Sequence, residues 1–335
     1  MRRREFIGSL IGTAVAWPLA SSAQPAAKVY RIAIVSPSRP VTAMNETSGV
    51  LAFKALFGEL RRLGYIEGQN LIVERYSGEG KIAHYAELTS EVVRQQPDVI
   101  FASSTRIVLP LKAATSTIPI VGEMGDPIHW GIVDSLARPG GNITGVSATE
   151  GQEIMGKRLG LLRELIRGAA RVGFLASRDI AESIHGDELR KAAQQAGISL
   201  VGPPLEGTIQ EAEYRRVFEL MKQERADGLT VSPQQENFTY TRLIVELAEK
   251  SLLPTIFPDR SFAKLGGLVS YGMNDLDSAP RLAGYIVRIL QGAKPSELPI
   301  ELATKFELII NLKTAKALDI TVPQILLAGA NEVIE

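Results

Sequence analysis

Residues 97–121 read PDVIFASSTRIVLPLKAATSTIPIV, and within this stretch two kinds of secondary structure alternate. The apolar run at 99–102 predicts a strand, and the hydroxyl side chains at 103–105 favour a helix N-cap. A helix is expected to continue to Ala114, and residues 118–121 predict another strand. A strand, a helix and a second strand in this order are typical of a parallel sheet covered by helices.

The same alternation extends from this stretch along almost the whole chain. Residues 50–63 place apolar side chains on one helical face, and the glycine-rich turn at 139–142 separates two similar sets of elements. Too many units follow one another for a single compact sheet, so the pattern predicts two α/β lobes. Further strands are predicted at 29–35, 71–73, 171–176, 199–201, 228–232 and 254–257, and further helices at 82–95, 153–166, 181–196, 211–224 and 237–250.

The N-terminus carries the pattern of a cleaved export signal. Arg3 and Arg4 precede Phe6 and an apolar stretch to residue 19, as in a twin-arginine signal, and this stretch is too short to span a bilayer comfortably. Small residues before and at Ala23 suit a signal peptidase. We therefore expect residues 1–23 to be a signal peptide, and the mature protein to begin near Gln24 in the periplasm.

Composition excludes several kinds of partner and site. The chain has 37 Lys and Arg against 37 Asp and Glu, which gives no electrostatic reason to expect nucleic acid or an anionic membrane surface as a partner. The absence of cysteine excludes disulfides, thiolate metal sites, a cysteine nucleophile and a cysteine-linked lipid anchor. His84, His129 and His185 lack a paired ligand spacing, so neither a metal nor a cofactor is expected.

No group of residues has the pattern of a catalytic site. The spacing Gly-x-Ser-x-Gly is absent, and so are the glycine patterns of dinucleotide and phosphate loops. Asp126 after a strand is open to three interpretations: a turn residue, a ligand contact or a catalytic carboxylate. Asp259 is either a ligand contact or one half of an exposed ion pair with Arg260, and Tyr271 either lines a site or packs within a lobe. The sequence favours binding without turnover.

Six collinear motifs resemble one family along nearly the whole mature chain. This family is the solute-binding component of ABC importers, in the group described as tryptophan- or tyrosine-type uptake proteins. One departure concerns residues 103–106, which read SSTR where the family often has Gly-Gly-Thr-Pro, and it suggests a ligand with more anionic or hydrogen-bonding character. The motifs are LGYIEGQN (63–70), KAATSTIPIV (112–121), GDP (125–127), RPGGNITGV (138–146), SYG (270–272) and TKFELIINLKTAKAL (304–318).

The resemblance implies the type I periplasmic binding-protein fold, with a ligand cleft between two lobes. It implies that residues 28–145 and 259–297 form the first lobe, and 146–258 and 298–335 the second. The expected partners are a small-molecule ligand, an amino acid or related carboxylate, and an ABC permease in the inner membrane, with the protein a monomer. A sensor or scaffold that has the same fold and no transport role is the alternative, and an enzyme on this scaffold is a third interpretation.

Ligands of open parallel sheets bind beyond the carboxyl ends of the strands. Ser104 and Thr105 open a helix whose free N–H groups favour a carboxylate, to which Arg106 adds a bidentate contact unless it points to solvent. Asp126 is expected to receive an ammonium group, and Tyr271 to stack on an apolar or aromatic body. The complete set of expected ligand-binding residues is Ser36, Ser38, Ser104, Thr105, Arg106, Gly125, Asp126, Thr149, Ser177, Ser232, Asp259 and Tyr271.

Overall fold

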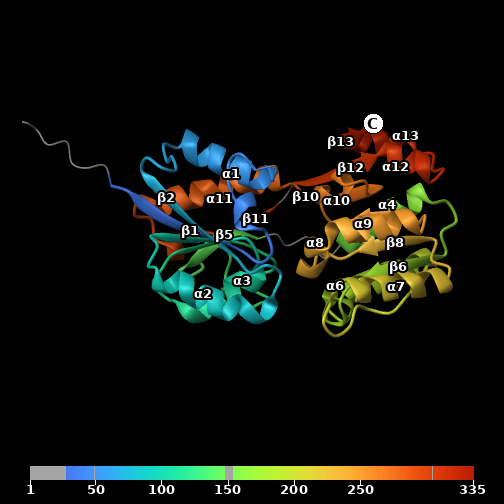
Figure 1. Cartoon of the computed structure of the whole chain (residues 1–335), viewed down its shortest axis with the longest axis horizontal. Helices are drawn as coiled ribbons and strands as arrows, with labels where there is room; N and C mark the ends of the chain where they lie inside the picture. Colours follow the sequence, from blue (N-terminus) through green and yellow to red (C-terminus); the bar gives the residue numbers. More distant parts are fainter. Residues whose placement is uncertain (1–27, 49, 148–153, 304) are drawn as a thin grey trace, which may run out of the picture.

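The computed structural model describes residues 28–48, 50–147, 154–303 and 305–335. Two α/β lobes lie side by side along the long axis of the molecule (Figure 1). Each lobe contains one sheet with helices on both faces, which confirms the predicted fold class. None of the helices in the described ranges is both long and apolar enough to cross a membrane.

The first lobe is a six-stranded, wholly parallel sheet in the order β11-β5-β4-β3-β1-β2. Its strands are β1 (Tyr30–Ser36), β2 (Leu71–Ser77), β3 (Val99–Ala102), β4 (Ile120–Met124), β5 (Ile143–Ser147) and β11 (Glu301–Leu302). Its helices are α1 (Leu51–Arg62), α2 (Tyr85–Arg94), α3 (Thr105–Ala114) and α11 (Asp275–Leu290), with short 3-10 turns at Val41–Ala43, Ile82–His84 and Pro295–Glu297.

The second lobe is a seven-stranded sheet in the order β13-β12-β10-β9-β8-β6-β7, in which only the β10–β12 pair is antiparallel. Its strands are β6 (Arg171–Leu175), β7 (Ser199–Val201), β8 (Gly228–Val231), β9 (Thr255–Phe257), β10 (Val269–Met273), β12 (Phe306–Asn311) and β13 (Glu332–Ile334). Its helices are α4 (Ile154–Leu165), α5 (Arg178–Ala181), α6 (Ile184–Ala196), α7 (Glu211–Gln223), α8 (Gln235–Thr239), α9 (Thr241–Lys250), α10 (Arg260–Lys264), α12 (Leu312–Ala317) and α13 (Gln324–Gly329).

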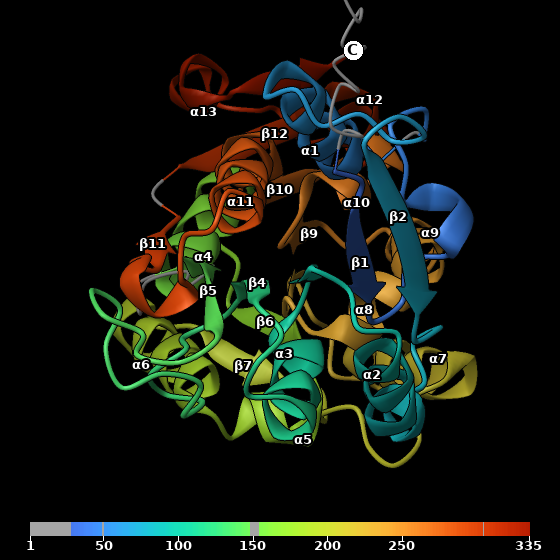
Figure 2. The ribbon, with the colours of Figure 1, turned by 90° about the vertical axis from the view of Figure 1, so that its left-hand side faces the viewer.

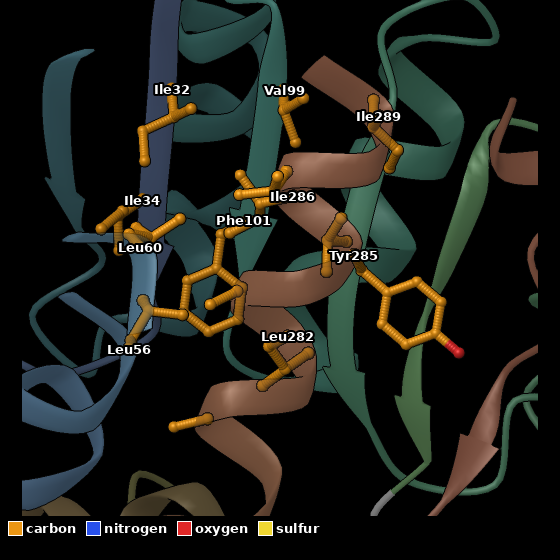
Figure 3. Close-up of a cluster of buried hydrophobic side chains, with 14 of the residues drawn as sticks. Ile32, Ile34, Leu56, Leu60, Val99, Phe101, Leu282, Tyr285, Ile286 and Ile289 are labelled. Atoms are coloured by element: carbon orange, nitrogen blue, oxygen red, sulfur yellow. The ribbon is translucent and has the colours of Figure 1, made fainter. Parts of the chain in front are cut away.

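Each sheet has a separate apolar core on each of its two faces. In the first lobe α1 and α11 cover one face while α2 and α3 cover the other (Figure 2). Figure 3 shows Leu282, Ile286 and Ile289 of α11 packed against side chains of β1 and β3. The apolar face expected for residues 50–63 is buried here, because Phe57 and its neighbours meet α11.

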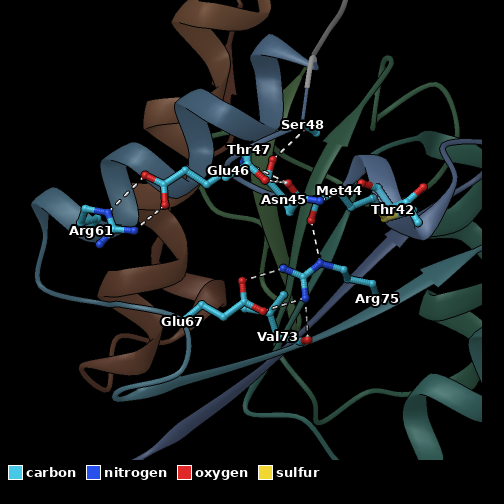
Figure 4. A network of polar contacts seen from close by, with 10 residues as sticks. All are labelled: Thr42, Met44, Asn45, Glu46, Thr47, Ser48, Arg61, Glu67, Val73 and Arg75. Carbon is cyan, nitrogen blue, oxygen red and sulfur yellow. Dashed lines mark hydrogen bonds and ion pairs between the residues drawn. The ribbon is translucent and has the colours of Figure 1, made fainter.

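A polar network holds the segment that follows β1. Arg75 on β2 donates from Nε to the Met44 carbonyl at 2.7 Å and from its two terminal nitrogens to Glu67 at 2.7 and 2.6 Å (Figure 4). Arg61 of α1 pairs with Glu46 in the same segment. These contacts anchor the chain just beyond Ser38, which lies on the side facing the second lobe.

The division between the lobes differs from the expected one in two places. Residues 259–297 were expected in the first lobe, but α10 and β10 belong to the second, and only α11 and the turn at Pro295–Glu297 return. Residues 298–335 were expected in the second lobe, but β11 extends the first sheet. The physical reason is pairing: β10 lies between β9 and β12, so the chain crosses at Asn274 rather than after Phe257.

Two of the segments that connect the lobes lie side by side. Met273 pairs with Phe306, and the Asn274 N–H donates to the Lys305 carbonyl at 3.0 Å. Lys305 also forms an ion pair with Asp277 of α11 at 2.6 Å. Residues 148–153, which follow β5 in the sequence and precede α4, lie outside the described ranges. The paired segments form a two-stranded connection that is suited to act as a hinge.

Candidate functional site

The beginning of α3 is fixed to the end of β4. Ser104 is the N-cap of α3, and its hydroxyl oxygen accepts from the Arg106 N–H at 3.2 Å. The Thr105 hydroxyl oxygen accepts from the Gly125 N–H at 2.7 Å. Each hydroxyl keeps its own hydrogen for donation. The structure therefore brings Ser104, Thr105 and Gly125 together, as the sequence predicted for strand ends on one edge of a sheet.

Asp126 forms the turn that follows β4. Its Oδ1 accepts from the backbone N–H groups of Ile128 and His129, both at 3.0 Å, and the residue is exposed. Of the three interpretations left open by the sequence, that of a turn residue accounts for these contacts. The second carboxylate oxygen carries none of these hydrogen bonds, so a ligand contact is compatible with the same turn.

Ser36 is the last residue of β1 and Ser38 follows two residues later, and the two serines differ in their surroundings. Ser36 is buried, and its hydroxyl oxygen accepts from the Arg39 N–H at 3.2 Å. Ser38 accepts a hydrogen bond from Nε2 of Gln235, which belongs to α8 of the second lobe. Ser38 therefore contacts the second lobe, whereas Ser36 stabilises the turn that contains Ser38 and Arg39.

Arg106 does not point to solvent. Its Nη1 donates to Oε1 of Glu236 at 3.0 Å, which joins α3 of the first lobe to α8 of the second. The Glu236 side chain is only 13% exposed. Glu236 was missed in the sequence because it lies inside an expected turn, where nothing in the local pattern marks it as facing another lobe.

Ser177 and Ser232, at the carboxyl ends of β6 and β8, converge on one residue that the sequence reasoning missed. The Ser177 N–H donates to Oε1 of Gln234 at 2.6 Å, and the Ser232 hydroxyl donates to the same oxygen at 3.0 Å. Gln234 is 4% exposed. Its position directly after the strand end at 228–232 is the signal that could have identified it.

Two polar side-chain atoms at the beginning of α8 have no hydrogen-bond partner among the described residues. They are Nε2 of Gln234 and Oε2 of Glu236, and both are buried. A buried polar group without a partner costs about 1–3 kcal/mol. Such atoms at an edge facing another lobe are candidates for contact with a bound molecule.

Asp259 and Tyr271 lie in the second lobe and not in the first. Asp259 is the N-cap of α10 and accepts from the Ser261 N–H at 2.8 Å, while Arg260 pairs instead with Glu307 at 3.2 Å. Tyr271 is 9% exposed, and its ring lies 5.9 Å from that of Phe306. The lobe-packing interpretation thus describes the position of Tyr271.

The loop that bears Asp259 is held against β10. The fully buried Arg158 donates from Nε to the Tyr271 carbonyl at 2.8 Å and from Nη2 to the Pro258 carbonyl at 3.4 Å. A Cβ on Gly272 would lie 1.7 Å from the Pro258 oxygen, so only glycine allows this approach. No local pattern in α4 marks Arg158 as a buried arginine.

Glu123 on β4 is a further residue that the sequence reasoning missed. Its carboxyl group accepts from the Ser278 hydroxyl at 2.8 Å. Burial raises the pKa of Glu123; the Ser278 hydrogen bond lowers it, and the negative charge of Asp259 raises it again. Asp259 belongs to the second lobe, so a charge from the opposite lobe contributes to the electrostatic environment of Glu123.

Thr149 lies outside the described residues, so its predicted role stays a prediction. Within the described ranges, no three His, Cys, Asp or Glu side chains are grouped so that they could hold a metal ion. The arrangement as a whole can offer hydrogen-bond donors, acceptors and charges of both signs from two facing lobes.

The family model described as ABC transporter substrate binding protein matches residues 41–334. A tyrosine-binding protein of Clostridioides difficile (strain R20291) is 25% identical over 271 residues, which are 80% of this chain and 76% of the relative.

Solved structures share the fold over nearly the whole chain. A conserved domain protein of Vibrio cholerae has a TM-score of 0.79 at 23% identity, over 91% of this chain and 100% of that one. An ABC domain from Streptococcus pneumonia in complex with L-Trp has a TM-score of 0.78 at 22% identity, over 92% of this chain and 100% of that one. The two-lobed architecture is thus that of the type I periplasmic binding proteins.

Proposed function

The chain belongs to the family of ABC transporter substrate-binding proteins, and on this premise we propose that it is the periplasmic solute-binding component of an ABC importer. It captures a small organic ligand, an amino acid or a related carboxylate, and delivers it to a permease in the inner membrane. Binding is the whole of its task, and no covalent step belongs to the mechanism.

The observation that carries this proposal is the contact between polar side chains of the two lobes at the carboxyl ends of their strands. Arg106 meets Glu236, and Ser38 meets Gln235. A ligand that contacts both lobes at this place favours the closed arrangement by its differential affinity for that state. Closure about the connection at Asn274 and Lys305 then creates one composite surface for the permease.

The first lobe supplies one half of the proposed site. The hydroxyl groups of Ser104 and Thr105 and the N-terminus of α3 favour a ligand carboxylate, while the free oxygen of Asp126 accepts from an ammonium group. Asp259 faces the hinge side of the site. The tyrosine-binding relative and the L-Trp complex support an amino acid as the ligand class.

The ligand class can be tested on protein that is purified from the periplasm. Mass spectrometry of the small molecule released by denaturation is expected to find one amino acid per chain. A sugar or a nucleoside would contradict the proposal.

The transport role needs a separate measurement. Cells that lack the gene are expected to lose uptake of the labelled ligand and to regain it when the gene is restored. Unchanged uptake, combined with a changed transcriptional response to the ligand, would favour a sensor of the same fold.

A further inference from the structure

We propose that Gln234 and Glu236 form the second lobe's half of the solute site, and that together with Arg106 they select a zwitterionic α-amino acid. Gln234 donates to the ligand carboxylate from the side opposite Ser104 and Thr105, and Glu236 accepts from the ligand ammonium group. This assignment rests on the proposed function and names the ligand class that its site takes.

The orientation of the Gln234 amide is fixed by its donors. A backbone N–H can only donate, so the group that accepts from Ser177 at 2.6 Å is the amide oxygen, and the Ser232 hydroxyl at 3.0 Å meets the same atom. The NH2 group therefore points away from both serines, and it has no partner among the described residues although the side chain is 4% exposed. An oxygen of a ligand satisfies it.

Glu236 offers the opposite kind of group. Its Oε1 accepts from Arg106 at 3.0 Å, whereas its buried Oε2 has no partner among the described residues. The neighbouring Gln235 bonds to Ser38 of the first lobe, so this short segment faces that lobe. A cationic N–H donor of the ligand satisfies Oε2.

The charges favour a zwitterion over a neutral polyol. Arg106 and Glu236 already pair with each other, so a ligand with both an ammonium and a carboxylate group adds one positive and one negative charge and leaves the net charge of the site unchanged. A simple carboxylate would leave Oε2 of Glu236 without a donor, and a simple amine would leave Nε2 of Gln234 without an acceptor.

Calorimetric titration of the mature chain tests the assignment. The probes are L-tyrosine and L-tryptophan, with tyramine and tryptamine as the amines that lack the carboxylate, and 3-(4-hydroxyphenyl)propionate and indole-3-propionate as the acids that lack the ammonium. The wild type is expected to bind an amino acid about 10- to 100-fold more tightly than either truncated form. This comparison needs no variant, so it does not depend on how a variant folds.

Two variants then separate the two contacts. Gln234→Glu keeps the oxygen that accepts from Ser177 and replaces the NH2 donor by a carboxylate oxygen. It is expected to weaken amino-acid binding about 10-fold or more and not to weaken amine binding, because the added negative charge attracts an ammonium group. Glu236→Gln is expected to weaken amino-acid and amine binding while acid binding changes least. Gln223→Glu and Glu211→Gln, at exposed positions of α7, are the matched controls.

The outcomes distinguish this assignment from the proposed function. Tight binding of an amino acid by the wild type with unchanged affinity in both variants would overturn the roles of Gln234 and Glu236 and leave the function standing. Equal losses for all ligands in Glu236→Gln and Arg106→Gln would reduce Glu236 to a contact between the lobes. An amine or an acid that binds as tightly as its parent amino acid would overturn the ligand class and this assignment with it.

Discussion

Arg106 Nη1 lies 3.0 Å from Glu236 Oε1, and this ion pair joins helix α3 of the first lobe to helix α8 of the second. The sequence left open whether the arginine binds the ligand or points to solvent; its Nη1 contacts the opposite lobe, and its contact with a ligand stays a prediction. Because the Glu236 side chain is 13% exposed, water screens the pair less than it would a surface pair. The pair therefore favours the arrangement in which the lobes are close.

Removing this ion pair is expected to open the ligand-free protein. Arg106→Met should increase the radius of gyration measured by small-angle X-ray scattering, and a double-mutant cycle with Glu236→Gln should give a coupling of about 1 kcal/mol. Arg215→Met, which removes an ion pair within α7, is the control. An unchanged radius of gyration in Arg106→Met would show that the pair does not hold the lobes together.

Asp126→Ala is expected to affect both binding and stability. Loss of a charge-assisted contact should weaken amino-acid binding by about one to two powers of ten. Because Oδ1 also accepts from Ile128 and His129, the free energy of unfolding should fall by about 0.5–2 kcal/mol. Asp126→Asn keeps an acceptor for the turn, so by calorimetry it should lose affinity and by denaturation retain stability. Unchanged affinity in both variants would remove Asp126 from the site.

Glu188 of α6 predicts a pH dependence of stability. Both of its carboxylate oxygens are buried without a partner among the described residues, and burial raises the pKa of Glu188 to about 7. The folded protein therefore holds a proton that the unfolded chain releases near pH 4.5, and the free energy of unfolding falls as the pH rises from there through about 7.

Glu188→Gln should remove this penalty. At pH 8 the variant is expected to be more stable by roughly 1–3 kcal/mol, and near pH 4.5 the gain should vanish. Urea unfolding at both pH values measures the difference, with the exposed Glu219→Gln as the control. A gain of equal size at both pH values would contradict titration of Glu188 as its cause.

The export signal predicts where the protein is found. Replacing both Arg3 and Arg4 by lysine should retain the precursor in the cytoplasm, because the twin-arginine pathway reads this pair. Cell fractionation measures the distribution, and N-terminal sequencing of the periplasmic form should begin near Gln24. Equal amounts of wild type and variant in the periplasm would contradict the twin-arginine assignment.

The architecture could be predicted because it depends on local patterns. The strands at 99–102 and 199–201 and the helix ending at Ala114 lie where the periodicity and the N-cap hydroxyls placed them. The lobe boundary near β10 could not be predicted, since it depends on the pairing of Val269–Met273 with a strand more than thirty residues later. Pairing over such a distance leaves no mark in a local pattern.

Part of the candidate site could be predicted, because local patterns also locate the ends of strands. Strand ends located Ser177 and Ser232 correctly at one edge of the second sheet. Which side chain they hold is a property of three-dimensional geometry, so Gln234 was missed. The partner of Arg106 could not be predicted either, because Glu236 lies 130 residues away in the sequence.

Hydrogen exchange with and without ligand tests most directly the claim that a solute is captured between the lobes. If the solute is captured in this way, an L-amino acid should slow exchange at residues 103–106 of the first lobe, at 232–237 of the second, and at the paired connection around Asn274. The exposed face of α7 should remain unchanged. Protection confined to one lobe, or protection at α7 with none at these segments, would contradict capture by closure of the two lobes.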